Sequence, residues 1–123
     1  MSAVSGTQEL MRVLCNAADT AAYGIGRVSL SIRGGEGFVR LYKGGIARVK
    51  AVISASGGSR GEVIAMTDEI AEKLTAFSGE GVIKISAPFP AILEKADKNG
   101  DVRFCREIEV IYRYTGVKTN DGK

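Results

Sequence analysis

The spacing of apolar residues predicts a helix at the start of the chain, over residues 5–22. Apolar side chains recur every three or four positions along one face of this segment: Leu10, Leu14, Ala17 and Ala21. The run Ser5-Gly6-Thr7-Gln8 fits a capping box, in which Ser5 and the polar side chain three residues later satisfy amide groups of the first turn. We therefore expect the helix to begin at Ser5.

Alternation of apolar and polar residues replaces the helical spacing after this segment. Residues 28–33 alternate in this way, as expected of a half-buried strand. The glycines of residues 34–37 then indicate a turn, because glycine is common where the chain reverses. We expect a second strand over residues 38–43.

A third strand is predicted after a tight turn at Gly44-Gly45. Glycine adopts the positive φ that two-residue hairpin turns require, so this pair suits such a turn. Residues 46–55 follow, with small apolar side chains on one face and Arg48 and Lys50 on the other. The small side chains indicate close packing beneath a helix.

Two interpretations of residues 62–77 are open. Apolar side chains lie at helical spacing along the whole segment: Val63, Met66, Ile70, Leu74 and Phe77. Alternatively, residues 62–66 form a strand, and Thr67 caps a shorter helix with acidic residues in its first turn. We prefer the longer helix.

The rest of the chain predicts two more strands and a tail. Residues 82–86 form a short strand, and residues 102–114 form a long one after an irregular stretch. Residues 115–123 are polar and contain glycine, so a frayed, flexible tail is expected there. No internal repeat is present.

Together, these elements predict an α+β fold. Its sheet is five-stranded and mostly antiparallel, two helices pack on one face, and the order is α-β-β-β-α-β-β. The length of 123 residues matches a single domain, which we place at residues 1–114. No apolar run approaches the roughly 20 residues of a membrane span, and the start of the chain does not resemble a signal peptide. A soluble intracellular protein is expected.

Composition argues against catalysis. The chain has no histidine, and its two cysteines, Cys15 and Cys105, are far apart in sequence. Histidine is the commonest general base, and it is also a frequent metal ligand and part of the usual nucleophile pairs. We therefore expect neither a metal site nor such a pair. Carboxylates such as Glu36 or Glu107 would have to act with Tyr42 or Lys43, and no spacing brings these residues together. We predict a protein that is not an enzyme and that needs no cofactor.

Three segments, two with glycines and one with aspartates, resemble ligand loops only in part. Residues 24–26 and 34–37 contain glycines, but neither continues into a complete phosphate-binding motif, so hairpin turns are favoured. Residues 97–101 begin like a calcium loop, but Val102 stands at the position of the required glycine and Ile108 at that of the glutamate. A turn into the last strand is the better interpretation.

Basic residues gather in the first half of the chain. Residues 1–60 contain eight Lys or Arg against three acidic residues, whereas the rest of the chain has nine basic and eleven acidic ones. Five of the basic residues lie on the predicted strands: Arg33, Arg40, Lys43, Arg48 and Lys50. Residues 37–41 also resemble the end of an RNA-recognition signature, although Glu36 replaces one stacking aromatic residue. Nucleic-acid binding through the basic strands is therefore an alternative function.

Residues 87–93 form an apolar stretch that contains Pro88, Phe89 and Pro90 and continues to Ile92. Because proline lacks a backbone donor, this segment cannot pair as a central strand. Two interpretations are open: a loop that folds over the domain's own core, or an arm that contacts a partner.

Residues 48–114 resemble the tail-terminator and minor capsid proteins that join head and tail in long-tailed bacteriophages. The resemblance rests on the order strand, amphipathic helix, Ile85-Ser86-Ala87-Pro88-Phe89-Pro90, aspartate-containing turn, and a strand that ends Glu109-Val110-Ile111-Tyr112. The glycine-rich hairpins and the basic first half depart from that family.

This resemblance implies a structural assembly protein of the virion. Its subunits would form a ring, commonly a hexamer, that binds the tail tube and the head connector in the virion or the host cytoplasm. It implies no catalytic residues. The candidate contact residues are Arg33, Arg40, Lys43, Pro88, Phe89, Pro90 and Ile92.

Overall fold

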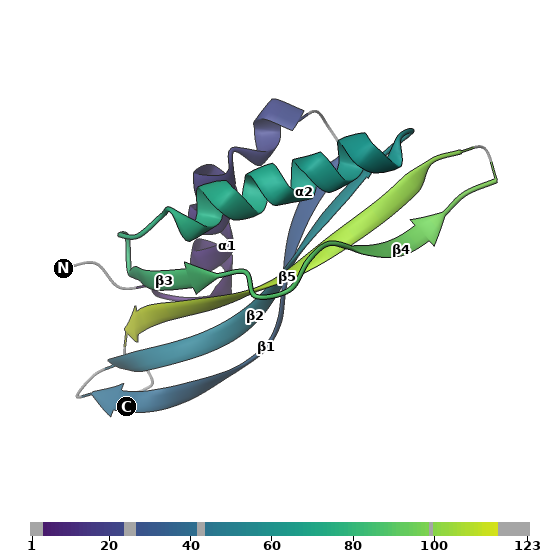
Figure 1. Cartoon of the computed structure of the whole chain (residues 1–123). Helices are drawn as coiled ribbons and strands as arrows, with labels where there is room; N and C mark the ends of the chain where they lie inside the picture. The colour runs from purple at the N-terminus through teal and green to yellow at the C-terminus, as the bar shows by residue number, and fades with distance from the viewer. Residues whose placement is uncertain (1–3, 24–26, 42–43, 99, 116–123) are drawn as a thin grey trace.

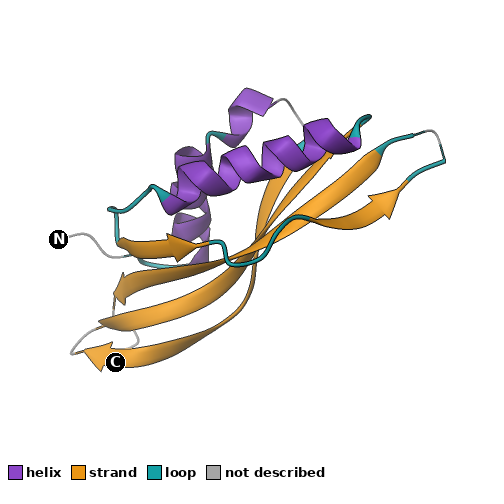
Figure 2. Cartoon of the chain, viewed as in Figure 1, coloured by secondary structure: helices purple, strands orange, loops and turns teal. Residues whose placement is uncertain are grey.

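An antiparallel five-stranded sheet carries both helices on one of its faces (Figures 1 and 2). The computed structural model describes residues 4–23, 27–41, 44–98 and 100–115. Its elements are α1 (Thr7–Ala18), the 3₁₀ helix η1 (Thr20–Tyr23), β1 (Val28–Leu41), β2 (Gly44–Gly57), α2 (Arg60–Thr75), β3 (Val82–Ser86), β4 (Ile92–Ala96) and β5 (Val102–Thr115). The predicted α+β class, the strand number and the placement of both helices on one face are confirmed.

The order of the elements differs from the prediction, because β1 is one strand rather than two. Its register against β2 shifts between Arg33 and Gly35 and again between Gly37 and Val39. Gly34 has a φ of +46°, in the left-handed region that glycine adopts without strain. The predicted turn at residues 34–37 is therefore wrong: these glycines accommodate bulges, which bend a strand without reversing it.

The predicted turn at Gly44-Gly45 is also wrong. Gly44 pairs with Leu41 and Gly45 with Arg40, so both glycines belong to β2. The two residues that connect Leu41 to Gly44, one of which is Lys43, lie outside the described residues. The glycines therefore permit close strand pairing at this end of the hairpin instead of forming its turn.

β4 was not predicted, and with it the order becomes α-β-β-α-β-β-β. β3 and β4 pair one after the other with the same side of β5, so together they form one interrupted edge of the sheet. All five residues of β4 are exposed. A strand without a buried face lacks the alternation by which strands are recognised in a sequence.

The first helix is shorter than predicted at both ends. Asp19 adopts a left-handed conformation, with φ 55°, and ends α1 at Ala18. At the other end, the capping box with Gln8 is wrong, because Gly6 is the N-cap residue. The backbone N–H and the hydroxyl of Ser5 instead donate to a carboxylate oxygen of Glu9, at 2.6 and 2.9 Å.

The longer form of the second helix is confirmed. Its N-cap residue is Ser59, whose hydroxyl accepts a hydrogen bond from the backbone N–H of Glu62 at 3.4 Å. Thr67, the cap of the alternative helix, is instead buried in the middle of α2 and donates to the carbonyl of Ile64 at 2.8 Å. The strand at residues 62–66 is therefore wrong.

The core lies between the helices and the face of the sheet that they cover. Its fully buried large side chains come from α1, α2, β2 and β5, with Val4 at the start of the described chain: Val4, Leu10, Val13, Leu14, Ile53, Val63, Ile70, Leu74, Ile108 and Val110. The opposite face, which we call the open face, is covered by none of the described elements (Figure 2). Its side chains are mainly the polar members of each alternating strand, with the apolar Val52 and Ile111 among them.

The end of the chain continues the sheet for one residue more than predicted. Thr115, expected in the frayed tail, pairs with Gly44 as the last residue of β5. Residues 116–123 of that tail lie outside the described residues. None of the helices in the described part is long and apolar enough to cross a membrane.

Candidate functional site

The Arg106 side chain of β5 binds the backbone of the segment between β3 and β4. We call residues 87–91 the proline arm; it runs alongside β5 in Figure 1. The Arg106 guanidinium donates to the carbonyl of Phe89 at 2.8 Å and to that of Ala87 at 3.2 Å. It also forms an ion pair with Asp68 of α2 at 2.8 Å. Only 19% of the Arg106 side chain is exposed, so its contacts fix the backbone of the arm.

The large side chains of this edge remain exposed although the backbone is fixed. The exposed fractions are 51% for Phe89, 60% for Ile92, 44% for Ile83 and 40% for Leu93. These are the exposed large hydrophobic residues of the described chain, and all four belong to β3, the arm or β4. We call them the apolar edge.

The arm combines features of both predicted interpretations. Ala87 and Ala91, near its two ends, pack against the core, as a loop over the domain would. Pro88, Phe89 and Pro90 between them are exposed. Small residues therefore anchor the arm, and its largest side chain adds little to the protein's own core.

A groove of about 370 Å³ lies beside the arm, against α2. Its lining residues are Asp68, Ala71, Glu72, Thr75, Ala87 and Arg106. Because Ala87 and Arg106 also hold the arm, the groove and the apolar edge form one continuous surface. A partner that covers Phe89 would therefore also meet the carboxylates of α2.

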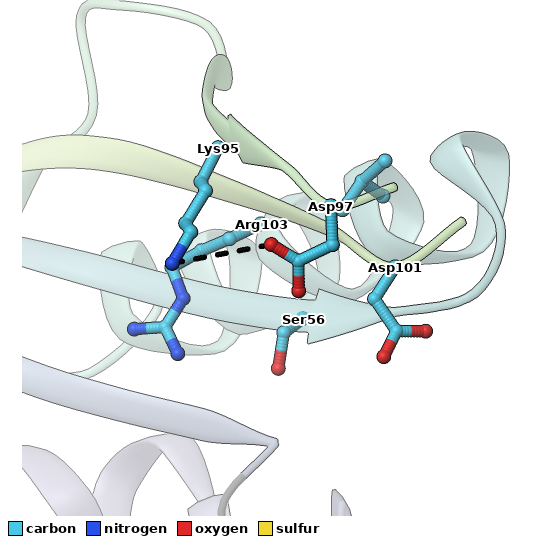
Figure 3. Close-up of a pocket in the computed structure, with 6 residues that line it drawn as sticks. Ser56, Lys95, Asp97, Asp101 and Arg103 are labelled. Carbon is cyan, nitrogen blue, oxygen red and sulfur yellow. Dashed lines mark ion pairs between the residues drawn. The ribbon is translucent and has the colours of Figure 1, made fainter. Parts of the chain in front are cut away.

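A second hollow, of about 190 Å³, lies at the hairpin between β4 and β5, with Ser56, Lys95, Asp97, Asp101, Val102 and Arg103 as its lining (Figure 3). Figure 3 shows Lys95 and Arg103 on one side and the two aspartates on the other, with an ion pair of 3.9 Å between Lys95 and Asp97. The backbone N–H of Asp97 donates to the carbonyl of Asp101 at 2.7 Å, and the backbone N–H of Gly100 donates to the carbonyl of Asp97 at 3.1 Å. The predicted turn is confirmed.

The structure brings some of the predicted basic residues together. Arg33 lies opposite Lys50 in the register of β1 and β2, and Arg48 lies two residues along β2 on the same open face. Lys50 forms a 4.0 Å ion pair with Glu107, and Glu109 lies opposite Lys50 on β5. The backbone of Arg40 pairs with Gly45, but its side chain lies outside the described part.

The residues proposed for catalysis are not assembled by the described structure. Glu107 lies on the open face and pairs with Lys50, while the side chain of Glu36, together with Tyr42 and Lys43, lies outside what is described. No group of three or more potential His, Cys, Asp or Glu ligands lies close enough to hold a metal ion among residues 4–23, 27–41, 44–98 and 100–115.

Arg106 is the candidate residue that sequence reasoning did not identify. It lies opposite Ile53, on the helix-covered side of β5, where the alternation otherwise places apolar side chains. The sequence contained one indication of its role: alternation places this basic residue on the buried face of the strand, where a charge needs a partner. Its partners come from residues 68, 87 and 89, and the sequence does not reveal that proximity.

Cys105 provides a native reporter of the open face. It lies opposite Ser54 on β2, and burial raises the pKa of its thiol, with a further contribution from the Glu94 carboxylate. We expect alkylation of Cys105 by iodoacetamide to keep accelerating above pH 9, because the thiolate is the reactive form. Mass spectrometry of the Cys105 peptide measures the rate. In urea, the alkylation rate of the same thiol should level off at a lower pH. Equal pH–rate profiles for the folded and the urea-unfolded protein would contradict the raised pKa of Cys105.

Comparisons with known proteins do not assign a family. No protein-family model matches the chain, and no curated protein sequence matches it.

Proposed function

We propose that this chain is a structural assembly subunit that binds a protein partner through its apolar edge. The carrying observation is the contrast between the backbone of the proline arm, tied down by Arg106, and the exposed side chains of Phe89 and Ile92. Exposed apolar patches usually mark interfaces. An aromatic residue whose backbone is already fixed loses less entropy on binding than one in a free loop, as at many interface hot spots.

The resemblance of residues 48–114 to head–tail joining proteins of long-tailed phages specifies the class. On this proposal, the protein is a ring-forming tail-terminator or head–tail joining subunit, and its partners are further copies, the tail tube and the head connector. Such a ring needs two different surfaces on each subunit. On this proposal, the apolar edge at β3 and β4 binds the tail tube or the head connector, and the contacts between copies use other surfaces of the subunit.

The proposal is tested by co-sedimentation with phage tail tubes and by sedimentation velocity of the chain alone. We expect binding or self-association, and we expect Phe89→Ser to weaken tube binding at least about tenfold, since truncation of a hot spot costs about 2 kcal/mol or more. Phe89→Leu is the matched control, because it keeps an apolar side chain and should retain most of the binding.

Two results would contradict the proposal. A chain that remains strictly monomeric and does not bind tail tubes is not a subunit of this class. If the tubes bind wild-type protein and Phe89→Ser equally, the arm is not the contact surface. Urea unfolding of both variants checks that they are folded, which is expected because about half of the Phe89 side chain is already exposed.

A further inference from the structure

Charge is divided between the two faces of the molecule. On the open face, strand register and alternation place mainly basic side chains: Arg33, Arg48, Lys50, Lys84, Lys95, Arg103 and Arg113, with the acidic Glu107 and Glu109. At its β4–β5 end, Asp97 and Asp101 share a hollow with Lys95 and Arg103, and Glu94 lies near Cys105. On the outer surface of α2, the exposed charged side chains are mainly acidic: Glu62, Asp68, Glu69 and Glu72, with the basic Arg60. The two faces therefore carry complementary charge.

Side-chain size is also complementary. Between its basic positions, the open face carries the apolar Val52, opposite Ser31, and serines of β1 and β2: Ser29, Ser31, Ser54 and Ser56. Their hydroxyls form no hydrogen bond within the described part of the chain. The outer surface of α2 exposes residues that are equally small: Gly61, Ala65, Thr75 and Ala76. Small residues on both surfaces let a helix approach a sheet closely enough for the longer charged side chains to meet.

The two surfaces also have similar lengths. The 16 residues of α2 extend about 24 Å at a rise of about 1.5 Å each. On β2, the stretch from Arg48 to Ser56 extends about 27 Å at a rise of about 3.4 Å per residue. One helix therefore spans most of this stretch.

From these observations we infer that the open face of one copy docks onto the outer surface of α2 of the next copy, as a repeated head-to-tail contact. This inference rests on the proposed function, of which it specifies the contact between copies. Because the two surfaces differ, the contact is heterologous, and it propagates into a ring or a filament according to the rotation between neighbours. The Phe89 side chain remains accessible in this arrangement, since it belongs to neither surface, whereas Ile92, opposite Cys105, lies at the margin of the open face.

A second copy fits the open face better than a nucleic acid does. Glu107 and Glu109 lie near the middle of the face, where a phosphate backbone would bring negative charge against them. The helix layer instead includes basic side chains, Arg60 and Lys73, among its acidic ones. The described side chains of the open face also include no aromatic residue on which single-stranded bases would stack.

Charge reversal on each surface tests the contact. The helix-reversed variant carries Ala65→Lys and Glu72→Lys, and the sheet-reversed variant carries Arg33→Glu and Arg103→Glu. All four side chains are exposed, and none forms an ion pair within the described structure. Glu69 is left unchanged, because it accepts a hydrogen bond from the Tyr23 hydroxyl. A chain with Arg33→Lys and Arg103→Lys keeps the charge and serves as the matched control.

Sedimentation velocity at an ionic strength of about 0.02 M, where screening is weak, gives the readout. We expect each reversed variant alone to associate at least about tenfold more weakly than wild type, since each then brings like charges together. Mixing the two variants should restore association, because each supplies the surface that the other has lost. A single chain with all four substitutions should also associate, which shows in addition that these substitutions permit folding.

Protection of Cys105 reports the same contact without any substitution. The thiol lies on the open face opposite Ser54, so stacking should slow its alkylation as the protein concentration rises. The four-substitution chain should show this protection, and each reversed variant alone should not.

Three results would overturn the inference. Association that neither reversal changes would place the contact elsewhere, for example at the apolar edge. Loss in both variants without recovery on mixing would exclude a contact between these two faces. Fluorescence anisotropy in which a labelled DNA duplex binds wild-type and helix-reversed protein, but not sheet-reversed protein, would assign the open face to nucleic acid. Phe89→Ser separates the two proposals, because it should reduce tube binding and leave this charge-dependent association unchanged.

Discussion

Replacement of Arg106 by methionine is expected to lower the free energy of unfolding by about 2 kcal/mol and to release the proline arm. The substitution keeps most of the apolar stem but removes the donors that bind the carbonyls of Ala87 and Phe89 and the carboxylate of Asp68. Hydrogen bonds from a charged group contribute about 1.5–3 kcal/mol each when buried, and those of Arg106 are partly exposed, so we expect less than their sum. The arm should then lose its fixed position.

Urea unfolding measures the stability change, and NMR backbone order parameters of residues 87, 89 and 91 measure release of the arm. Arg12→Met is the control, because the ion pair of Arg12 with Glu9 is long, at 3.9 Å, and exposed. Such a surface pair contributes about 0–1 kcal/mol. If Arg106→Met leaves the order parameters of the arm unchanged, Arg106 does not hold the arm, and the preorganisation argument for Phe89 fails.

The larger effect on stability is expected from Ile108→Ala, about 3 kcal/mol. Ile108 is fully buried on β5, opposite Ala51, which is also fully buried. Since the neighbouring side chain is already as small as alanine, it cannot fill the space that the isoleucine leaves. Truncation of a buried isoleucine to alanine typically costs about 2–5 kcal/mol, and total stabilities are about 5–15 kcal/mol.

Ile111→Ala is the matched control on the same strand. Ile111 is only half-buried on the open face, so its loss should cost about 1 kcal/mol, the usual size of a point-mutation effect. Urea denaturation of both variants with an unchanged slope would attribute the difference to stability alone. Equal losses at the two positions would contradict the assignment of the core to one face of the sheet.

The arm shows why the candidate site was only partly predictable. The prolines and Phe89 are visible in the sequence, and they restrict residues 87–93 to a loop or an edge. Whether the aromatic side chain is buried depends on Arg106, which is 17 residues away from Phe89. Contacts over such distances follow from strand pairing, and a single sequence does not specify which strands pair.

The basic residues illustrate the same limit. Along the chain, positive charge is concentrated in the first 60 residues, which suggested a difference between two halves. In the structure, Arg103 and Arg113 of β5 join Arg33 and Lys50 on the open face, while the acidic residues of α2 lie on the other side. The charged residues are thus divided between the layers of the fold, and their positions along the chain show this division only in part.

By itself, the sequence determined the elements whose periodicity has a buried face: both helices, the long strands β2 and β5, and the α+β class that they imply. Hydrophobic burial imposes that periodicity, so it can be detected without coordinates. Only the tertiary structure decided the continuity of β1 across its glycines, the presence of β4 and the clamp on the arm. Each of these depends on a partner that is distant in the sequence: a paired strand for β1 and β4, and Arg106 for the arm. The residue pattern of a short segment does not identify that partner.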